Sequence, residues 1–182
     1  TGAPNDLWPG EGLVRDGKKL RAAAVLIGLV EHGDGMTVLL TQRTAILKNH
    51  SGQISFPGGG RDPPDGSPEE TALREAEEEI GLPRDQVELV GRMSTQDTGT
   101  GYRVMPVVGL VTPPLSLVPA PAEVAEGFEV ELDFVLDPAN HSTETHFYRG
   151  LERETMVMRH DRFFIWGLTA RLLKELSDML RR

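Results

Sequence analysis

The chain has 182 residues, 38% of them apolar, a formal net charge of −9 and no cysteine. Its length fits one domain, and its apolar content can fill a single core. Residues 1–20 are expected to form a loosely structured arm or, near Gly12 to Arg15, a short edge strand. Without cysteine, disulfides and zinc–thiolate sites are excluded, and a reducing, cytoplasmic setting is expected. The negative charge argues against nonspecific binding to nucleic acid or to an anionic membrane. No apolar run approaches the roughly 20 residues of a membrane span, and no signal-peptide pattern is present.

The first regular elements are predicted to be a β-hairpin. Residues 22–30 are apolar and rich in β-branched side chains, which is typical of a buried strand. Residues 33–35 read Gly-Asp-Gly and predict a turn, and residues 36–42 form a second strand.

The next segment, residues 43–52, gathers basic side chains in a mostly acidic protein. Arg43, Lys48 and His50 lie within eight positions, and a short strand at residues 53–56 then leads to Pro57 and three glycines. Basic residues in a loop often only face water. Because this cluster precedes an acidic motif, we expect it to bind anions such as phosphate.

A helix is predicted over residues 68–80. Ser67 is a favourable N-cap, Pro68 suits the first helical position, and Glu70 three residues on completes a capping box. Gly81 is the expected left-handed stop.

The faces of this helix follow from about 100° of rotation per residue. One arc is apolar and should face the core; it holds Ala72, Leu73, Ala76 and Ile80. A second arc holds Glu75, Glu78 and Glu79, while Glu77 points elsewhere. Three carboxylates on one flank repel one another unless a cation lies between them, and oxygen ligands suit Mg²⁺ or Mn²⁺. The alternative is a solvated acidic face without function.

Beyond the helix, strands are predicted at residues 87–93 and 104–111. They flank the Gly-rich loop 94–102, which either lines a substrate or only connects the strands. Residues 112–122 hold four prolines and are predicted to lack regular structure.

The last third of the chain should add β-structure and one helix. The alternating residues 127–136 predict a strand, residues 145–149 and 155–158 a hairpin, and residues 163–166 the approach to a helix that ends near Leu180. Leu168, Leu172, Leu176 and Leu180 form a core-facing stripe, with a dimer face as the alternative. His141, His146 and His160 show no metal-binding spacing and are taken as structural or exposed.

The acidic helix and the loop before it resemble the Nudix box, Gly-x5-Glu-x7-Arg-Glu-U-x-Glu-Glu-x-Gly-U, where U is apolar. The matching residues are Gly60, Arg74, Glu75, Ala76, Glu78, Glu79, Gly81 and Leu82. One position departs: the pattern has Glu where this chain has Gly66, with Asp65 beside it.

Residues 39–59 resemble the signature that precedes the box in the coenzyme A pyrophosphatase branch of that family. Arg43, Gly52, Phe56, Pro57, Gly58 and Gly59 match it. Lys48 stands where Arg is usual and Thr44 where Ser or Ala is usual, and the opening spacer is one residue short. Lysine keeps the charge but loses the bidentate geometry of arginine.

The resemblance implies an α+β Nudix fold, an α/β/α sandwich around a mixed sheet, and a Mg²⁺- or Mn²⁺-dependent pyrophosphohydrolase. It implies that Glu75, Glu78, Glu79 and the backbone of Gly59 bind metal, and that Arg74 orients the carboxylates. Glu78, Glu79 and the later Glu123 are candidates for the general base, with an ordinary surface position as the alternative for Glu123 and for Glu126. Substrate contacts are expected from Arg43, Lys48, His50, Gly58 and Gly60.

Coenzyme A is the substrate that the resemblance implies, cleaved to 3′,5′-ADP and 4′-phosphopantetheine by a monomer or homodimer. Another Nudix diphosphatase, acting on ADP-ribose or NADH, would share the box residues. A non-catalytic binding module is the third possibility, and Gly66 is the only sequence feature that favours it.

Overall fold

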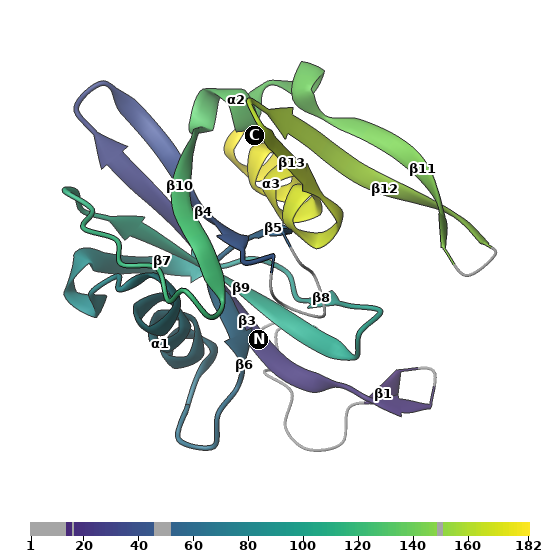
Figure 1. The fold of residues 1–182 in the computed structure, drawn as a ribbon, viewed down its shortest axis with the longest axis horizontal. Helices are drawn as coiled ribbons and strands as arrows, with labels where there is room; N and C mark the ends of the chain where they lie inside the picture. The colour runs from purple at the N-terminus through teal and green to yellow at the C-terminus, as the bar shows by residue number, and fades with distance from the viewer. Residues whose placement is uncertain (1–13, 16, 46–51, 149–150) are drawn as a thin grey trace.

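The computed structural model describes residues 14–15, 17–45, 52–148 and 151–182, which form three sheets and a few helices (Figure 1). The strands are β1 Val14–Arg15, β2 Lys18–Lys19, β3 Arg21–His32, β4 Gly35–Arg43, β5 Ile54–Ser55, β6 Gly58–Gly60, β7 Val87–Arg92, β8 Gln96–Asp97, β9 Tyr102–Val111, β10 Val124–Glu131, β11 Ser142–Tyr148, β12 Leu151–His160 and β13 Phe163–Trp166. The α-helices are α1 Pro68–Ile80, α2 Leu132–Leu136 and α3 Gly167–Leu180. Two 3-10 turns, Arg84–Gln86 and Pro138–Asn140, complete the described elements.

The central sheet is mixed, with the strand order β10-β4-β3-β9-β7. The hairpin β3–β4 is antiparallel, as predicted, whereas β3 and β9 pair in parallel along ten residues. The short strands β5, β6 and β8 pair with β4, β3 and β9 respectively. The glycine run before the acidic helix is therefore part of the sheet.

Helices cover both faces of this sheet, because alternate residues of its strands are apolar on each face. On one face α1 buries Ala72, Ala76 and Ile80 against Leu26 and Leu39. On the other face the leucines of α3 pack against a second group of strand residues, among them Ile27, Leu29, Val38 and Leu40. Figure 1 shows α1 and α3 on opposite sides of the central strands. This is the predicted α/β/α sandwich around a mixed sheet.

A second, three-stranded sheet, β11-β12-β13, was not anticipated as a separate layer. The predicted hairpin is present but longer, and its strands reach away from the central sheet (Figure 1). The strand predicted over residues 127–136 is wrong in its second half. β10 ends at Glu131 and α2 follows, with Val135 buried in the core.

The leucine stripe of α3 is confirmed except at its last residue, and partly buried Leu168 packs against the core at its start. Leu172 and Leu176 are buried, whereas Leu180 at the helix end is 51% exposed. Among the described helices, none is long and apolar enough to cross a membrane.

Candidate active site

The acidic helix α1 has the predicted bounds and caps. Ser67 has extended backbone angles and accepts a hydrogen bond from the backbone N–H of Glu70, and Gly81 adopts a left-handed conformation with φ of 66°. The capping box differs in one detail, because the Glu70 carboxylate accepts from the N–H of Gly66. Both ends of the helix are therefore fixed by local hydrogen bonds.

Strand β6 runs beside α1 and consists only of glycine. The Gly58 N–H donates to Oε2 of Glu79 at 3.1 Å, and the Gly60 carbonyl accepts from Nη2 of Arg74 at 2.9 Å. A Cβ placed on Gly59 would lie 2.5 Å from Oε1 of Glu75. The missing side chains therefore let the backbone approach the helix carboxylates directly.

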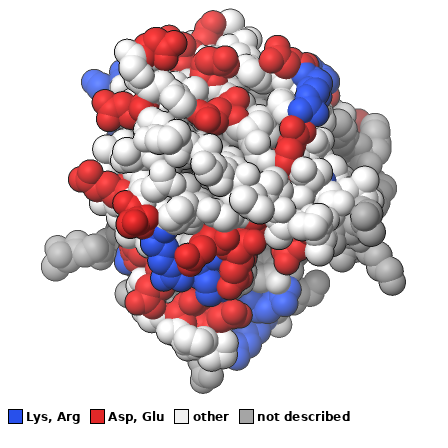
Figure 2. All heavy atoms as spheres, turned by 60° about the vertical axis from the view of Figure 1, so that its left-hand side comes forward, with Lys and Arg blue, Asp and Glu red and all other residues white. Residues whose placement is uncertain are grey.

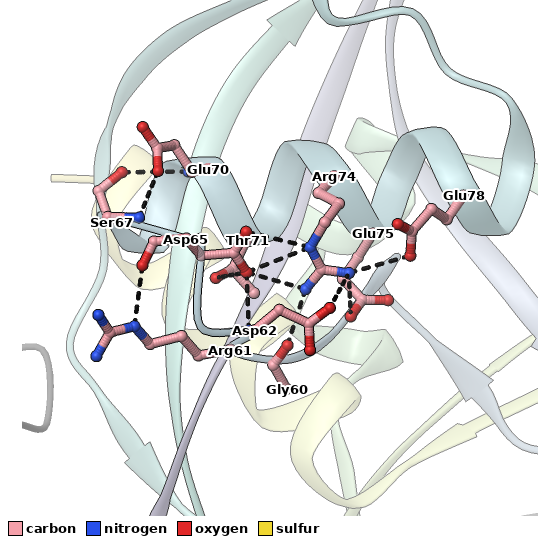
Figure 3. A network of polar contacts seen from close by, with 11 residues as sticks. Gly60, Arg61, Asp62, Asp65, Ser67, Glu70, Thr71, Arg74, Glu75 and Glu78 are labelled. Carbon is pink, nitrogen blue, oxygen red and sulfur yellow. Dashed lines mark hydrogen bonds and ion pairs between the residues drawn. The ribbon is translucent and has the colours of Figure 1, made fainter. Parts of the chain in front are cut away.

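Arg74 is the centre of a polar network on this flank (Figure 3). Its Nη1 donates to Glu75 Oε1 and to Glu78 Oε2, both at 3.0 Å. Only 15% of its side chain is exposed. Arg74 thus contacts both carboxylates at once, and its role in orienting them stays a prediction.

Asp65 holds the other side of the Arg74 guanidinium. Its carboxylate accepts from Arg74 Nε at 3.2 Å and from Nη2 at 3.0 Å, and also from Thr71 Oγ1 and the Asp62 N–H. Burial by itself raises the pKa of Asp65, but the hydrogen bonds from Arg74, Asp62 and Thr71 together lower it to about 2. Asp65 thus supplies a buried carboxylate next to the position where the Nudix pattern has glutamate and this chain has Gly66.

Replacing Asp65 with asparagine should lower the free energy of unfolding by about 1–3 kcal/mol, because a buried guanidinium loses its charged partner. Asp62→Asn is the matched control, since Asp62 lies on the same loop but is 61% exposed and 3.7 Å from Arg74. Urea unfolding measures both variants. Equal losses would contradict the central role of Asp65.

Two carboxyl groups of α1, buried Glu79 and half-buried Glu75, lie next to other negative charges. Burial raises the pKa of Glu75; Arg74 opposes this, and the charges of Glu78 and Glu123 add to it. Burial also raises the pKa of Glu79 to about 7, opposed by the Gly58 hydrogen bond and the charge of Arg43, and reinforced by Glu75 and Glu123.

The raised pKa of Glu79 predicts that the protein without divalent ions loses stability as pH rises from about 4.5 to about 7. Below that window both the folded and the unfolded state hold the proton. Within it the unfolded chain releases the proton more readily, so rising pH favours unfolding, and above it the loss is complete. Denaturation midpoints measured in chelator should show this decline in the wild type and a flatter profile in Glu79→Gln.

Glu123 and Arg43 lie near the carboxylates of α1, at the start of β10 and the end of β4. The Thr44 N–H donates to the Glu123 carbonyl at 3.0 Å, and the Ala120 N–H donates to the Glu79 carbonyl at 2.8 Å. These bonds tie the proline-rich loop to the end of α1 and bring exposed Glu123 towards the helix carboxylates. Of the predicted basic cluster, Arg43 is placed here, whereas Lys48 and His50 lie outside the described residues.

The residues present fit a hard divalent cation. Buried Glu79, half-buried Glu75 and exposed Glu78 offer oxygen ligands on one flank, and the Gly59 backbone lies directly against the Glu75 carboxylate. Within the described part of the chain, no three acidic or imidazole side chains already stand in a ligand arrangement. Glu75 and Glu78 each contact Arg74 at 3.0 Å instead. Metal binding by this set stays a prediction.

On the face of the molecule drawn in Figure 2, Lys and Arg side chains lie next to Asp and Glu side chains. Figure 2 shows Lys and Arg side chains in small groups bordered by Asp and Glu, with a broad uncharged area between the charged regions. Ion pairs between described residues include Arg92 with Glu69 and Arg162 with Glu126.

The NUDIX domain model matches residues 18–157, which is well over half of the sequence, so the chain belongs to the NUDIX domain family. It is a Nudix hydrolase. Similar proteins named "Uncharacterized Nudix hydrolase NudL" occur in Photorhabdus laumondii, with 40% identity over 161 residues, and in Escherichia coli, with 39% identity over 157 residues. These alignments cover 88% and 86% of this chain and 86% and 81% of the relatives.

Solved structures agree with this fold. A Nudix hydrolase from M. smegmatis, RenU, is 29% identical with a TM-score of 0.54, over 62% of this chain and 71% of that one. A C. elegans Ap4A hydrolase binary complex is 19% identical with a TM-score of 0.58, over 87% of this chain and 98% of that one. The second likeness concerns the fold alone.

Asp65 is the site residue whose role the sequence did not define. The signal was its place beside Gly66 and nine positions before Arg74, but spacing alone does not show which way an aspartate in a loop points.

Proposed function

We propose that this Nudix hydrolase cleaves the diphosphate of coenzyme A to 3′,5′-ADP and 4′-phosphopantetheine, with Mg²⁺ or Mn²⁺ as cofactor. The observation that carries the proposal is the packing of α1 against the glycine strand β6, which sets Glu75 and Glu79 beside an unobstructed backbone, with Glu78 joined to Glu75 through Arg74. The upstream residues 39–59, with Arg43 near Glu79, favour coenzyme A within the class.

In this proposal Glu75, Glu78 and Glu79 hold the metal with the Gly59 backbone. The bound ion supplies neutralisation of the phosphate oxygens and a lowered pKa for a bound water. Arg74 fixes the directions of Glu75 and Glu78, and Gly58 fixes Glu79. Water attacks one phosphorus, the bridging P–O bond breaks, and the proton passes to a carboxylate not committed to Arg74, either Glu79 or Glu123.

Product analysis after incubation with Mg²⁺ or Mn²⁺ tests this function. Coenzyme A, ADP-ribose and NADH should be compared at equal concentration, because ADP-ribose and NADH are the alternatives within the family. Release of 3′,5′-ADP from coenzyme A at the highest kcat/KM supports the proposal. A higher kcat/KM for ADP-ribose or NADH would make that compound the substrate in place of coenzyme A. If none of the three compounds is hydrolysed with or without metal, the protein is a binding module.

Arg43 and Lys48 are proposed to bind the 3′-phosphate of coenzyme A. Changing both to alanine should raise KM for coenzyme A by roughly 10-fold, as expected for a lost charge-assisted hydrogen bond, and raise KM for 3′-dephospho-coenzyme A much less. Steady-state kinetics on both substrates provide the comparison. Arg171→Ala, an exposed change of the same charge on α3, is the control. Equal increases for both substrates would remove this assignment.

A further inference from the structure

The loop between β9 and β10, residues 112–122, carries no charged side chain, although 26% of all residues in the chain are charged. Figure 1 shows this loop on the side of the molecule where α1 lies, and Figure 2 brings that side forward with a broad uncharged area. A ligand group without charge can lie on such a surface without removing water from a charged side chain.

The inner side of the loop is packed onto the protein. Half-buried Leu115 and Leu117 pack against the core cluster that α1 covers, so the loop and the helix carboxylates share one face of the central sheet. Leu117 lies over Gly127 of β10, where an added Cβ would be only 2.9 Å from Leu117 Cδ1. The loop therefore presents a surface of defined shape although it has no regular structure.

One end of the loop reaches the carboxylate site. The Ala120 N–H donates to the Glu79 carbonyl, and the Val118 N–H donates to the Ile80 carbonyl, both at 2.8 Å. Glu123, whose charge acts on the Glu79 carboxyl group, follows directly after the loop. The uncharged surface thus begins at the carboxylates and continues across the end of α1.

The outer side of the loop is exposed. Its residues alternate as in an extended chain, with Pro114, Ser116 and Val118 exposed between the half-buried leucines. Val118 is 71% exposed, more than any other large apolar side chain among the described residues. A ligand that removes this side chain from water gains hydrophobic stabilisation.

The loop backbone also has open hydrogen-bonding groups. Among the described residues, the N–H groups of Leu115, Ser116 and Leu117 have no hydrogen-bond partner. An extended segment with open donors and acceptors can pair with another amide-bearing chain, as a sheet edge pairs with an added strand.

We infer that this loop holds the pantetheine arm of coenzyme A, the part of the proposed substrate that has amide groups and no charge. With the diphosphate at the α1 carboxylates, the arm extends from Ala120 past Val118, its methyl groups on Val118 and its amides along the loop backbone. The nucleotide half, which carries the additional phosphate, lies towards Arg43. The inference rests on the proposed function for its substrate, and it makes Val118 a specificity-determining residue.

Calorimetry with the separate products in Mg²⁺ tests the two halves of the substrate without turnover. The wild type should bind 4′-phosphopantetheine more tightly than inorganic phosphate, because the arm adds contacts beyond the phosphate. Val118→Asn should weaken 4′-phosphopantetheine binding by about 5- to 10-fold, as expected for losing the burial of one valine side chain, and leave 3′,5′-ADP binding unchanged. Asparagine adds no charge, so the electrostatics of the carboxylate site are preserved.

Leu180→Asn is the matched control, because Leu180 is also exposed (51%) but lies on α3, across the sheet from the loop. It should change neither affinity. Unchanged 4′-phosphopantetheine binding in Val118→Asn, or equal wild-type affinity for 4′-phosphopantetheine and inorganic phosphate, would overturn the inference. If Val118→Asn hydrolyses coenzyme A with the wild-type KM, the surface is refuted and the proposed function is kept. Valine-dependent 4′-phosphopantetheine binding in a protein that hydrolyses none of the diphosphates would keep the surface and refute the function.

Discussion

Glu79→Gln is expected to reduce kcat for diphosphate hydrolysis by about 10²- to 10⁴-fold, the range for loss of an acid–base group. Glutamine keeps the volume of this buried side chain and can still accept from the Gly58 N–H, so the fold should survive. It removes the negative charge that a divalent ion and a departing proton both require. Initial rates at saturating Mg²⁺ or Mn²⁺, with circular dichroism for the fold, measure this effect.

Glu77→Gln is the matched control on the same helix. Glu77 is 54% exposed and pairs with Arg84 at 3.1 Å, away from the Arg74 network. Its loss should change neither kcat nor KM beyond about 2-fold, because exposed ion pairs contribute little. Similar rate losses in both variants would indicate a general effect of helix charge and would sink the specific role of Glu79.

Gly58→Ala should have the largest effect on stability, a loss of about 3 kcal/mol in the free energy of unfolding. A Cβ at this position would lie 2.4 Å from the Ala24 carbonyl oxygen and 2.6 Å from the Val25 Cα. Both are backbone atoms of the central strand β3, so β6 must move away and the Gly58–Glu79 bond is lost with it. Urea unfolding followed by fluorescence provides the measurement.

The neighbouring glycines make the comparison specific. At Gly59 the three atoms nearest to the added carbon belong to the Glu75 carboxylate, the end of a flexible side chain, so activity should fall while stability changes little. At Gly60 the nearest atom is Cε1 of Tyr102 at 3.9 Å, an ordinary contact, so alanine should be tolerated. Equal destabilisation by all three substitutions would contradict the close approach at Gly58.

The bounds of helix α1 could be predicted from the sequence because the capping residues that set them are adjacent to the helix ends. Ser67, Pro68 and Gly81 act within a few residues of the ends they fix, and the bounds of α1 match the prediction. The hairpin β3–β4 was predicted equally well, because an apolar, β-branched run and a glycine turn define it. The flank shared by Glu75, Glu78 and Glu79 follows from helix geometry alone.

The parts that failed depend on contacts distant in sequence. Residues 132–136 alternate like a strand, yet they turn into α2 because Val135 packs into the core beside α3. The sequence could not show whether Asp62 or Asp65 pairs with Arg74, because that depends on how the loop folds back onto α1. The uncharged loop 112–122 gave no functional signal, because hydrogen bonds to the end of α1 are what bring it to the carboxylates.

Arg74 also places a positive charge among the acidic side chains of α1. Its guanidinium is held by Asp65 and the Gly60 carbonyl as well as by Glu75 and Glu78. The chain thus carries its own tethered positive charge at the place where acidic side chains crowd together. Folding can therefore finish before any ion is loaded, in contrast to small domains that collapse only around their metal.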